Sequence, residues 1–268
     1  MKTSPSFSAY TKSPYRSIKH TTYFSVYDHL FSKFRNKKIV FIEIGVLAGG
    51  SLFMWRKFFG SKARIIGIDM NPHAKKWEKY GFEIFIGSQS DKNFWRNFCK
   101  KIGQIDIVLD DGGHTYDQQI ITTEMLLENI KDGGLLVVED THTSYMNGFG
   151  EAKYSFINYT KNMIDRINKR FSKLSNNKNE TRVWSIEIYE SIVAFCVNKK
   201  KANEISVPTD NGGENDKSAD YRYEDNQAIK NLDYINKLLK YIPGFKFIIR
   251  QLKFFIIRLS CKSKVFFK

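Results

Sequence analysis

Short runs of branched and aromatic apolar residues recur along the first two-thirds of the chain, separated by polar or glycine-containing segments. Five of these runs alternate with stretches that are long enough for a crossover helix, which is typical of buried parallel strands in an α/β domain. The expected strands span residues 38–44, 63–70, 82–91, 105–109 and 135–138.

Two more apolar runs follow at residues 182–190 and 191–199, with almost no loop between them. A connection this short permits only an antiparallel pair. The pattern therefore predicts a Rossmann-like α/β fold, in which a mostly parallel seven-stranded sheet carries helices on both faces.

The remaining segments differ in composition from the expected sheet domain. Residues 1–16 are polar and turn-rich, so we expect them to be mobile. From Ser17 to Phe34 apolar residues recur at near-helical spacing, which predicts a helix; His20 and Tyr23 within it can line a ligand site or simply pack. The expected organisation is an N-terminal segment with lead-in helix (1–36), a main domain (37–199), a flexible linker (200–227) and a C-terminal basic helical extension (228–268).

The formal net charge of +15 suggests a nucleic-acid-binding protein at first sight. Its distribution argues otherwise, because residues 244–268 hold nearly half of the excess and contain no acidic side chain. We therefore expect no nucleic-acid partner. The three cysteines, Cys99, Cys196 and Cys261, have neither metal-ligand nor redox spacing.

The C-terminal extension combines basic residues with an apolar stripe. Seven apolar residues recur there at helical spacing: Phe245, Ile248, Ile249, Leu252, Phe255, Ile256 and Leu259. The stripe suits either a peripheral contact with an anionic membrane or partner, or a terminal helix folded back over the domain's own core. No secretory h-region and no run of 18 uncharged apolar residues is present, so we expect a cytoplasmic protein, at the inner membrane face if the extension binds lipid.

A glycine-rich turn follows the first expected strand. It reads Glu43-x-Gly45-x-x-x-Gly49-Gly50 and continues with Ser51. The nicotinamide fingerprint G-x-G-x-x-G fails because its second glycine is replaced by leucine. An acid before the first glycine and two glycines after it instead favour S-adenosylmethionine, with Glu43, Gly45, Gly49 and Ser51 as candidate cofactor-binding residues.

The ends of the next two strands supply further cofactor candidates. Asp69 ends the second strand, where a carboxylate can accept hydrogen bonds from ribose hydroxyls. Gln89, Ser90 and Asp91 follow the third strand, where an adenine edge can be bound. Asp91 has a simpler alternative, since it can cap the helix that begins at residue 92.

Acidic pairs end the fourth and fifth strands. Asp110-Asp111 is followed by His114, and Glu139-Asp140 ends the fifth strand. Ends of neighbouring strands lie roughly 5 Å apart, so four carboxylates and an imidazole would crowd one sheet edge. That arrangement is costly unless a cation or a reaction requires it, although each motif alone is also a common turn or helix start.

The stretches EIGVLAGGSLFMWRKFF, IGSQSD, LDDGGH and GGLLVVEDTHTSY resemble the metal-dependent sugar O-methyltransferases of macrolide biosynthesis, within the wider cephalosporin hydroxylase-like family. The resemblance spans about Ser17 to Asn198 and implies the class I methyltransferase fold. It also implies a Mg²⁺ ion held by Asp111, Glu139 and Asp140, with His114 as general base. Asp110 is then left either to contact the cofactor or to orient the histidine.

The expected function is therefore S-adenosylmethionine- and Mg²⁺-dependent O-methylation of a sugar hydroxyl in a glycan, sugar nucleotide or glycosylated metabolite. Two departures from the family pattern concern the acceptor: His142 in the second acidic motif and the cationic extension. A rival substrate class is catechol-like phenols, for which Tyr145, Trp55 and Phe149 can supply an aromatic clamp. A nucleic-acid- or membrane-binding protein that uses its basic tail is the non-enzymatic alternative, and the sequence leaves a homo-oligomer open.

Overall fold

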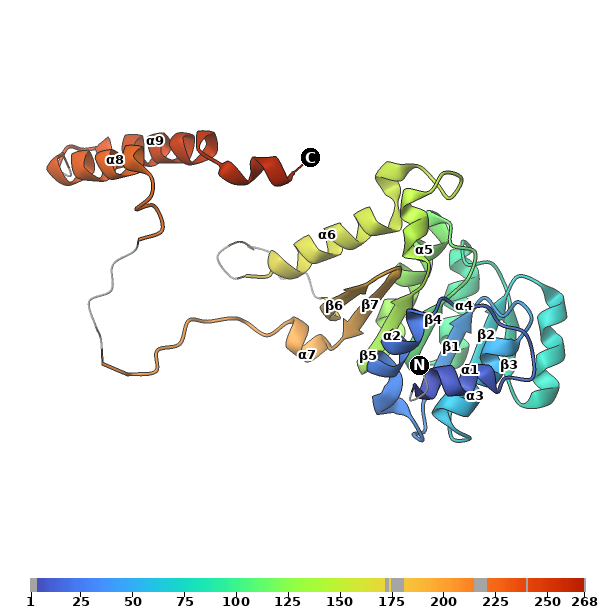
Figure 1. Ribbon diagram of the computed structural model, residues 1–268. Coiled ribbons are helices and arrows are strands. Elements are labelled where there is room, and N and C mark those ends of the chain that lie inside the picture. Colours follow the sequence, from blue (N-terminus) through green and yellow to red (C-terminus); the bar gives the residue numbers. More distant parts are fainter. Residues whose placement is uncertain (1–3, 172–173, 175–180, 215–220, 240, 268) are drawn as a thin grey trace. The chain divides into compact units, whose positions relative to one another are not determined.

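The computed structural model describes residues 4–171, 174, 181–214, 221–239 and 241–267 (Figure 1). The chain divides into two compact units, Met1–Val207 and Pro208–Lys268. The first unit therefore includes the N-terminal segment that the sequence suggested as a separate region, and the boundary near residue 207 falls within the expected linker.

The first unit is built on one seven-stranded sheet with the order β3-β2-β1-β4-β5-β7-β6. Strands β1 to β5 are parallel, and β7 pairs antiparallel with both β5 and β6. The predicted mostly parallel sheet with its closing antiparallel pair is thus confirmed, and the order is that of the class I methyltransferase fold. The strands are β1 (Val40–Ile44), β2 (Arg64–Asp69), β3 (Glu83–Ile86), β4 (Ile105–Asp110), β5 (Ile130–Val138), β6 (Val183–Tyr189) and β7 (Ile192–Val197).

Alternate strand residues point to opposite faces of the sheet and build two separate cores. Phe41 and Ile107 belong to one core, whereas the adjacent Ile42 and Val108 belong to the other. The first core is covered by α1 (Pro5–Thr11), α2 (Tyr23–Phe31) and α3 (Gly50–Phe59). The second is covered by α4 (Lys92–Ile102), α5 (Tyr116–Leu126) and α6 (Phe156–Asn168), so helices cover both faces as predicted (Figure 1).

Short elements complete the first unit. They are the 3₁₀ helices η1 (Ser32–Phe34), η2 (Pro72–Tyr80), η3 (Leu127–Asn129), η4 (Thr141–Tyr145) and η5 (Ala152–Tyr154), and the one-turn helix α7 (Lys199–Ala202). The predicted lead-in helix is shorter than residues 17–34, because the helical stretch begins only at Tyr23.

The expectation of a mobile N-terminus is wrong for the described residues from Ser4 onward. Ser4 caps α1, and Asp28 of α2 accepts hydrogen bonds from the Ser4 hydroxyl at 2.5 Å and from the Ser6 backbone amide at 2.9 Å. Ala9 is buried in the first core. The polar composition of this segment reflects specific bonds to α2, and local sequence does not reveal such long-range partners.

The described residues of the second unit form two α-helices and a 3₁₀ helix: α8 (Gln227–Leu238), α9 (Phe245–Leu259) and η6 (Lys262–Phe266). Helices α8 and α9 contact each other, and each buries one isoleucine, Ile229 and Ile249. The predicted C-terminal helical extension is confirmed. Within the described residues, no helix has the length and apolarity needed to cross a bilayer.

Candidate functional site

The carboxyl ends of β1, β2, β4 and β5 meet at one edge of the sheet. Ile44 lies beside Ile68 on one side and beside Asp110 on the other. The backbone ladder continues one residue past the strands, where the amides of Gly45, Asp111 and Glu139 donate to neighbouring carbonyls at 2.9, 3.0 and 2.9 Å. The residues that follow each strand are therefore held in a row, as predicted.

The glycine turn after β1 requires residues without a side chain. Gly45 has φ +88°, and a Cβ there would lie 2.0 Å from the Asp111 backbone oxygen. Gly49 has φ +80° and would meet the Trp77 ring at 2.2 Å. Both positions favour glycine because of their backbone conformation and because the turn packs directly on neighbouring segments.

Asp69 fixes this turn from the end of β2. Its Oδ2 accepts hydrogen bonds from the Val46 and Leu47 amides at 2.9 and 3.1 Å, and its Oδ1 accepts one from the Asn71 amide at 2.8 Å. The carboxylate thus organises the backbone of the cofactor turn. Its predicted bond to a ribose remains a prediction, and no local sequence pattern indicates this supporting role.

Glu43 lies beneath the turn and not on its surface. It is fully buried and accepts hydrogen bonds from Ser51 Oγ at 2.7 Å and Trp55 Nε1 at 2.9 Å. Burial raises the pKa of Glu43 to about 7, although the Lys19 charge and these hydrogen bonds act in the opposite direction. Glu43 therefore links β1 to α3, and it can influence a cofactor only through the turn or Ser51.

The loop after β4 is held from below by Gln89. Its amide nitrogen donates to Asp110 Oδ1 at 2.8 Å, and its amide oxygen accepts from the Gly113 backbone at 2.9 Å. Burial raises the pKa of Asp110 to about 7, while bonds from the Gly112 amide and Gln89 lower it. Asp110 is thus a buried anchor of the loop that carries Asp111 and His114.

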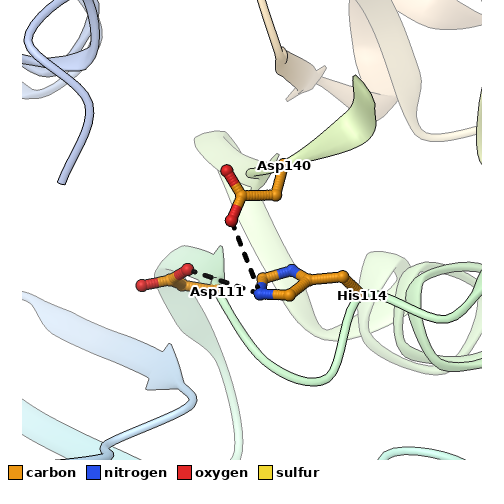
Figure 2. A group of neighbouring side chains, drawn as sticks. All are labelled: Asp111, His114 and Asp140. Carbon is orange, nitrogen blue, oxygen red and sulfur yellow. Dashed lines mark ion pairs between the residues drawn. The ribbon is translucent and has the colours of Figure 1, made fainter. Parts of the chain in front are cut away.

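Asp111, His114 and Asp140 converge above this edge, as Figure 2 shows. His114 Nε2 lies 3.5 Å from Asp140 Oδ2 and 3.9 Å from Asp111 Oδ1. One ligand atom from each residue lies within 4.8 Å of the other two, so the three can hold a metal ion together. Their side chains are each a little over one-fifth exposed, which leaves the cluster open to a ligand.

Two members of this cluster have an unusual backbone conformation. His114 has φ +58° and Asp140 has φ +54°, in the left-handed region that non-glycine residues rarely adopt. Such conformations cost about 1–3 kcal/mol and concentrate at functional sites. His114 Nδ1 is also buried, and no hydrogen-bond partner for it exists in the part of the chain that the structure describes.

Lys19 brings a positive charge into the acidic site. Its side chain is only 2% exposed, and Nζ donates to Asp111 Oδ2 at 2.5 Å and to Glu139 Oε2 at 2.8 Å. Burial alone would lower the pKa of Lys19, but the charges of Asp111, Glu139 and Glu43 outweigh it and raise the pKa well above its usual value. Lys19 therefore remains an ammonium ion, and nothing in its sequence context indicated this role.

Both carboxylate oxygens of Glu139 accept a hydrogen bond from a neighbouring side chain. It is fully buried, and its Oε1 accepts a hydrogen bond from Tyr27 at 2.5 Å while Oε2 accepts from Lys19. Burial raises its pKa, and Lys19 opposes that rise. Tyr23 similarly donates to Asp140 Oδ1 at 2.5 Å, so the segment from residue 16 to 27 reaches both acidic motifs.

A cavity of about 570 Å³ opens over this edge. It is within the size range of small-molecule sites. Eight of the predicted site residues line it: Gly45, Ser51, Asp69, Gln89, Asp111, His114, Glu139 and Asp140. The N-terminal segment supplies a further wall, made of Arg16, Ser17, Ile18, Lys19, His20 and Tyr23.

The other predicted cofactor residues are placed elsewhere. Glu43, Gly49 and Asp110 lie behind the lining residues described above, and Ser90 and Asp91 are exposed outside the lining. The Asp91 side chain accepts a hydrogen bond from the Asn93 amide at 2.7 Å and caps α4. The capping alternative for Asp91 is thus confirmed, and direct cofactor binding by these five residues stays a prediction.

The aromatic clamp that a catechol substrate would need is not assembled at the cavity. Trp55 is completely buried in the first core, and Tyr145 and Phe149 are outside the cavity lining. His142, the unusual residue of the second acidic motif, is bonded to Ser191 and lies 4.0 Å from Asp140 Oδ1. It stands beside the acidic cluster and outside the lining.

Comparisons with known proteins agree with this geometry. Residues 42–141 match a family described as a methyltransferase domain. Mycinamicin VI 2''-O-methyltransferase of Micromonospora griseorubida is 30% identical over 200 residues, which cover 68% of this chain and 49% of that protein. A tetracenomycin-C relative of Streptomyces olivaceus, 8-demethyl-8-(2-methoxy-alpha-L-rhamnosyl)-tetracenomycin-C 3'-O-methyltransferase, is 34% identical over 139 residues, which cover 47% of this chain and 34% of that protein.

A solved structure shares the fold. The MycE methyltransferase from the mycinamycin biosynthetic pathway, in complex with Mg, SAH and mycinamycin VI, gives a TM-score of 0.66 at 27% identity and covers 77% of this chain and 55% of that chain. The resemblance to sugar O-methyltransferases of macrolide pathways is thereby confirmed. The chain spans about half the length of the curated relative from Micromonospora griseorubida, and less of the other.

Proposed function

We propose that this chain is an S-adenosylmethionine- and Mg²⁺-dependent O-methyltransferase that methylates a hydroxyl of a sugar, in a glycan, a sugar nucleotide or a glycosylated metabolite. The observation that carries the proposal is the convergence of Asp111, His114 and Asp140 beside the glycine turn in one cavity. The relatives support the substrate class, because both are named as O-methyltransferases and the name of the Streptomyces olivaceus relative specifies a rhamnosyl-bearing compound.

The cofactor side of the cavity is the turn between Gly45 and Ser51. Gly45, Ser51 and Asp69 line this side of the cavity, and Asp69 is where ribose hydroxyls would bind. Asp69 also accepts hydrogen bonds from the Val46 and Leu47 amides, so the turn is held in one conformation before the cofactor binds. Such preorganisation lowers the entropic cost of binding.

The acceptor side is the cluster around His114. A sugar hydroxyl is a weak nucleophile at neutral pH, so its proton has to leave as the bond to the methyl carbon forms. His114 accepts that proton, while the carbon–sulfur bond of the cofactor breaks and its electron pair stays on sulfur. General-base assistance of this kind contributes about 10²–10⁴-fold to the rate.

The residues fit a magnesium ion. Asp111 Oδ1 and Asp140 Oδ2 are hard oxygen donors that face each other across the cluster, which is the ligand type that Mg²⁺ prefers. When bound, the ion would orient and acidify the acceptor hydroxyl. Glu139 stays a predicted ligand, because its oxygens are occupied by Lys19 and Tyr27 and would have to be shared or released. His114 faces the same atoms and can act as ligand or as base; the proposal assigns it the base.

Methyl transfer from labelled S-adenosylmethionine tests the proposal directly. The full chain is incubated with Mg²⁺ and a panel of sugar nucleotides, glycosides and catechols, with and without chelator. We expect label in the sugar fraction only, loss of label with chelator, and a fall of about 10²–10⁴-fold for His114→Ala. His73→Ala, at an exposed histidine outside the cavity, is the matched control. Transfer to catechols alone, or full turnover by His114→Ala, would contradict the proposal.

A further inference from the structure

Helix α9 leaves a continuous apolar stripe uncovered. Ile248, Leu252, Phe255 and Leu259 follow one another at spacings of four, three and four residues, which places them on one side of the helix. They are 54%, 43%, 59% and 65% exposed. The stripe is distinct from the side of α9 that packs within its own unit, where Ile249 is buried.

Further exposed apolar residues extend this surface within the second unit. After α9, Val265, Phe266 and Phe267 are 63%, 84% and 85% exposed. Leu238 at the end of α8 is 61% exposed. So many exposed apolar residues, in a unit whose described residues form two α-helices and a 3₁₀ helix, indicate a binding surface.

The charge of the same segment identifies the partner. Residues 244–268 contain basic side chains and no acidic one. Lys253 pairs with Asp233 of α8 and Lys262 lies near Asp225, whereas the ion pairs among the described residues include none for Lys246, Arg250 or Arg258. Uncompensated positive charge beside exposed apolar groups matches the phosphates and acyl chains of an anionic bilayer.

We propose that the second unit binds the surface of an anionic membrane through α9 and η6. The helix lies in the plane of the interface, with its apolar stripe between the acyl chains and its basic residues at the lipid phosphates. A 15-residue helix is about 22 Å long and cannot span a hydrocarbon core of about 30 Å. A second copy is the less suitable partner, because pairing two stripes would bring two acid-free basic segments together.

Vesicle flotation of the full chain tests the proposal, which does not depend on the catalytic assignment. Vesicles contain phosphatidylcholine either alone or mixed with phosphatidylglycerol. We expect flotation only with the anionic vesicles, and a decline as salt increases. Two variants should each lose at least about tenfold in partitioning: Leu252→Glu with Phe255→Glu, and Lys246→Ala with Arg250→Ala and Arg258→Ala.

Controls of the same chemical kind change exposed residues of the first unit. Tyr154→Glu replaces an exposed aromatic residue, and Lys57→Ala with Lys62→Ala and Lys100→Ala removes three exposed charges. Both should float like the unchanged chain, and circular dichroism should show that all four variants keep their helices.

Four results would overturn the proposal. The first is equal binding to neutral and anionic vesicles, or binding to neither. The second is a dimer in light scattering that the Leu252→Glu, Phe255→Glu variant dissociates, which would make a second copy the occupant. The third is destabilisation of the first unit by that variant, which would make the stripe part of the domain's own packing. The fourth is binding of RNA without binding of vesicles.

Discussion

Replacing Lys19 with methionine removes the ammonium group and keeps most of the side-chain volume. Nζ lies 2.5 Å from Asp111 and 2.8 Å from Glu139, so at an effective dielectric constant of about 20 each attraction is about 6–7 kcal/mol. Desolvation of the buried groups offsets much of this gain. Removing one partner of a buried pair costs about 3–5 kcal/mol, because the other charges remain buried without compensation.

We therefore expect Lys19→Met to lower the free energy of unfolding by about 3–5 kcal/mol in chelator. Saturating Mg²⁺ should restore a large part of this loss, because a cation that binds only the folded state at 100 times its Kd adds about 2.7 kcal/mol. Urea unfolding with chelator and with Mg²⁺ measures both quantities. Lys12→Met, at an exposed lysine, is the control and should change neither.

Two outcomes would refute the reasoning about Lys19. If Lys19→Met unfolds at the same urea concentration as the unchanged chain in chelator, the ammonium does not compensate the acidic cluster. If Mg²⁺ stabilises the variant no more than the unchanged chain, Lys19 and the ion do not share the carboxylates. Lys19→Arg keeps the charge but changes the shape of the side chain. Its free energy of unfolding should lie between those of Lys19→Met and the unchanged chain.

Three further predictions concern the supports of the site. Glu43→Gln should flatten the pH dependence of the free energy of unfolding. The pKa of Glu43 in the folded chain, about 7, exceeds its usual value of 4.5, so the protonated carboxyl stabilises the fold at low pH. This contribution, up to about 3 kcal/mol, is lost as the pH rises through 7. Melting temperatures between about pH 5 and pH 8 test this, and an unchanged slope contradicts it. Gly45→Ala should destabilise the fold by more than Gly81→Ala. Both glycines have positive φ, but only at Gly45 would the added Cβ lie 2.0 Å from a backbone atom. Equal urea midpoints for the two variants would show that this steric clash does not lower stability. Tyr23→Phe removes the hydrogen bond to Asp140 and should weaken Mg²⁺ binding about 10–100-fold in calorimetric titration, whereas an unchanged Kd would exclude Tyr23 as a support.

The sheet and its acidic edge could be predicted because both depend on local pattern. Buried parallel strands are short apolar runs, and the residue after each run lies at the carboxyl edge whatever the rest of the chain does. The sequence alone therefore places Asp111, Glu139 and Gly45 at one edge. The capping alternative for Asp91 followed from equally local chemistry.

The supporting contacts could not be predicted because they join segments far apart in sequence. Lys19 is 92 and 120 residues away from its two carboxylate partners, and a lysine in a polar segment carries no mark of burial. The same holds for Asp28, which accepts a hydrogen bond from the Ser6 amide in the first helix. It also holds for Asp69, whose carboxylate accepts a hydrogen bond from the Val46 amide in the glycine turn. Sequence reasoning located the reactive edge and offered His20 and Tyr23 as possible lining residues, which the cavity confirms. It did not reveal Lys19 or the contacts that hold this N-terminal wall against the acidic motifs.

Binding of a divalent cation most directly tests the central claim that two distant acidic motifs converge on one ion beside His114. Calorimetric titration of Mg²⁺, or of Mn²⁺ as its spectroscopic substitute, should give a single site that Asp111→Asn and Asp140→Asn each weaken at least about tenfold. Asp117→Asn, at an exposed acid on α5, should leave it unchanged. Equal affinity in all four proteins would contradict the claim.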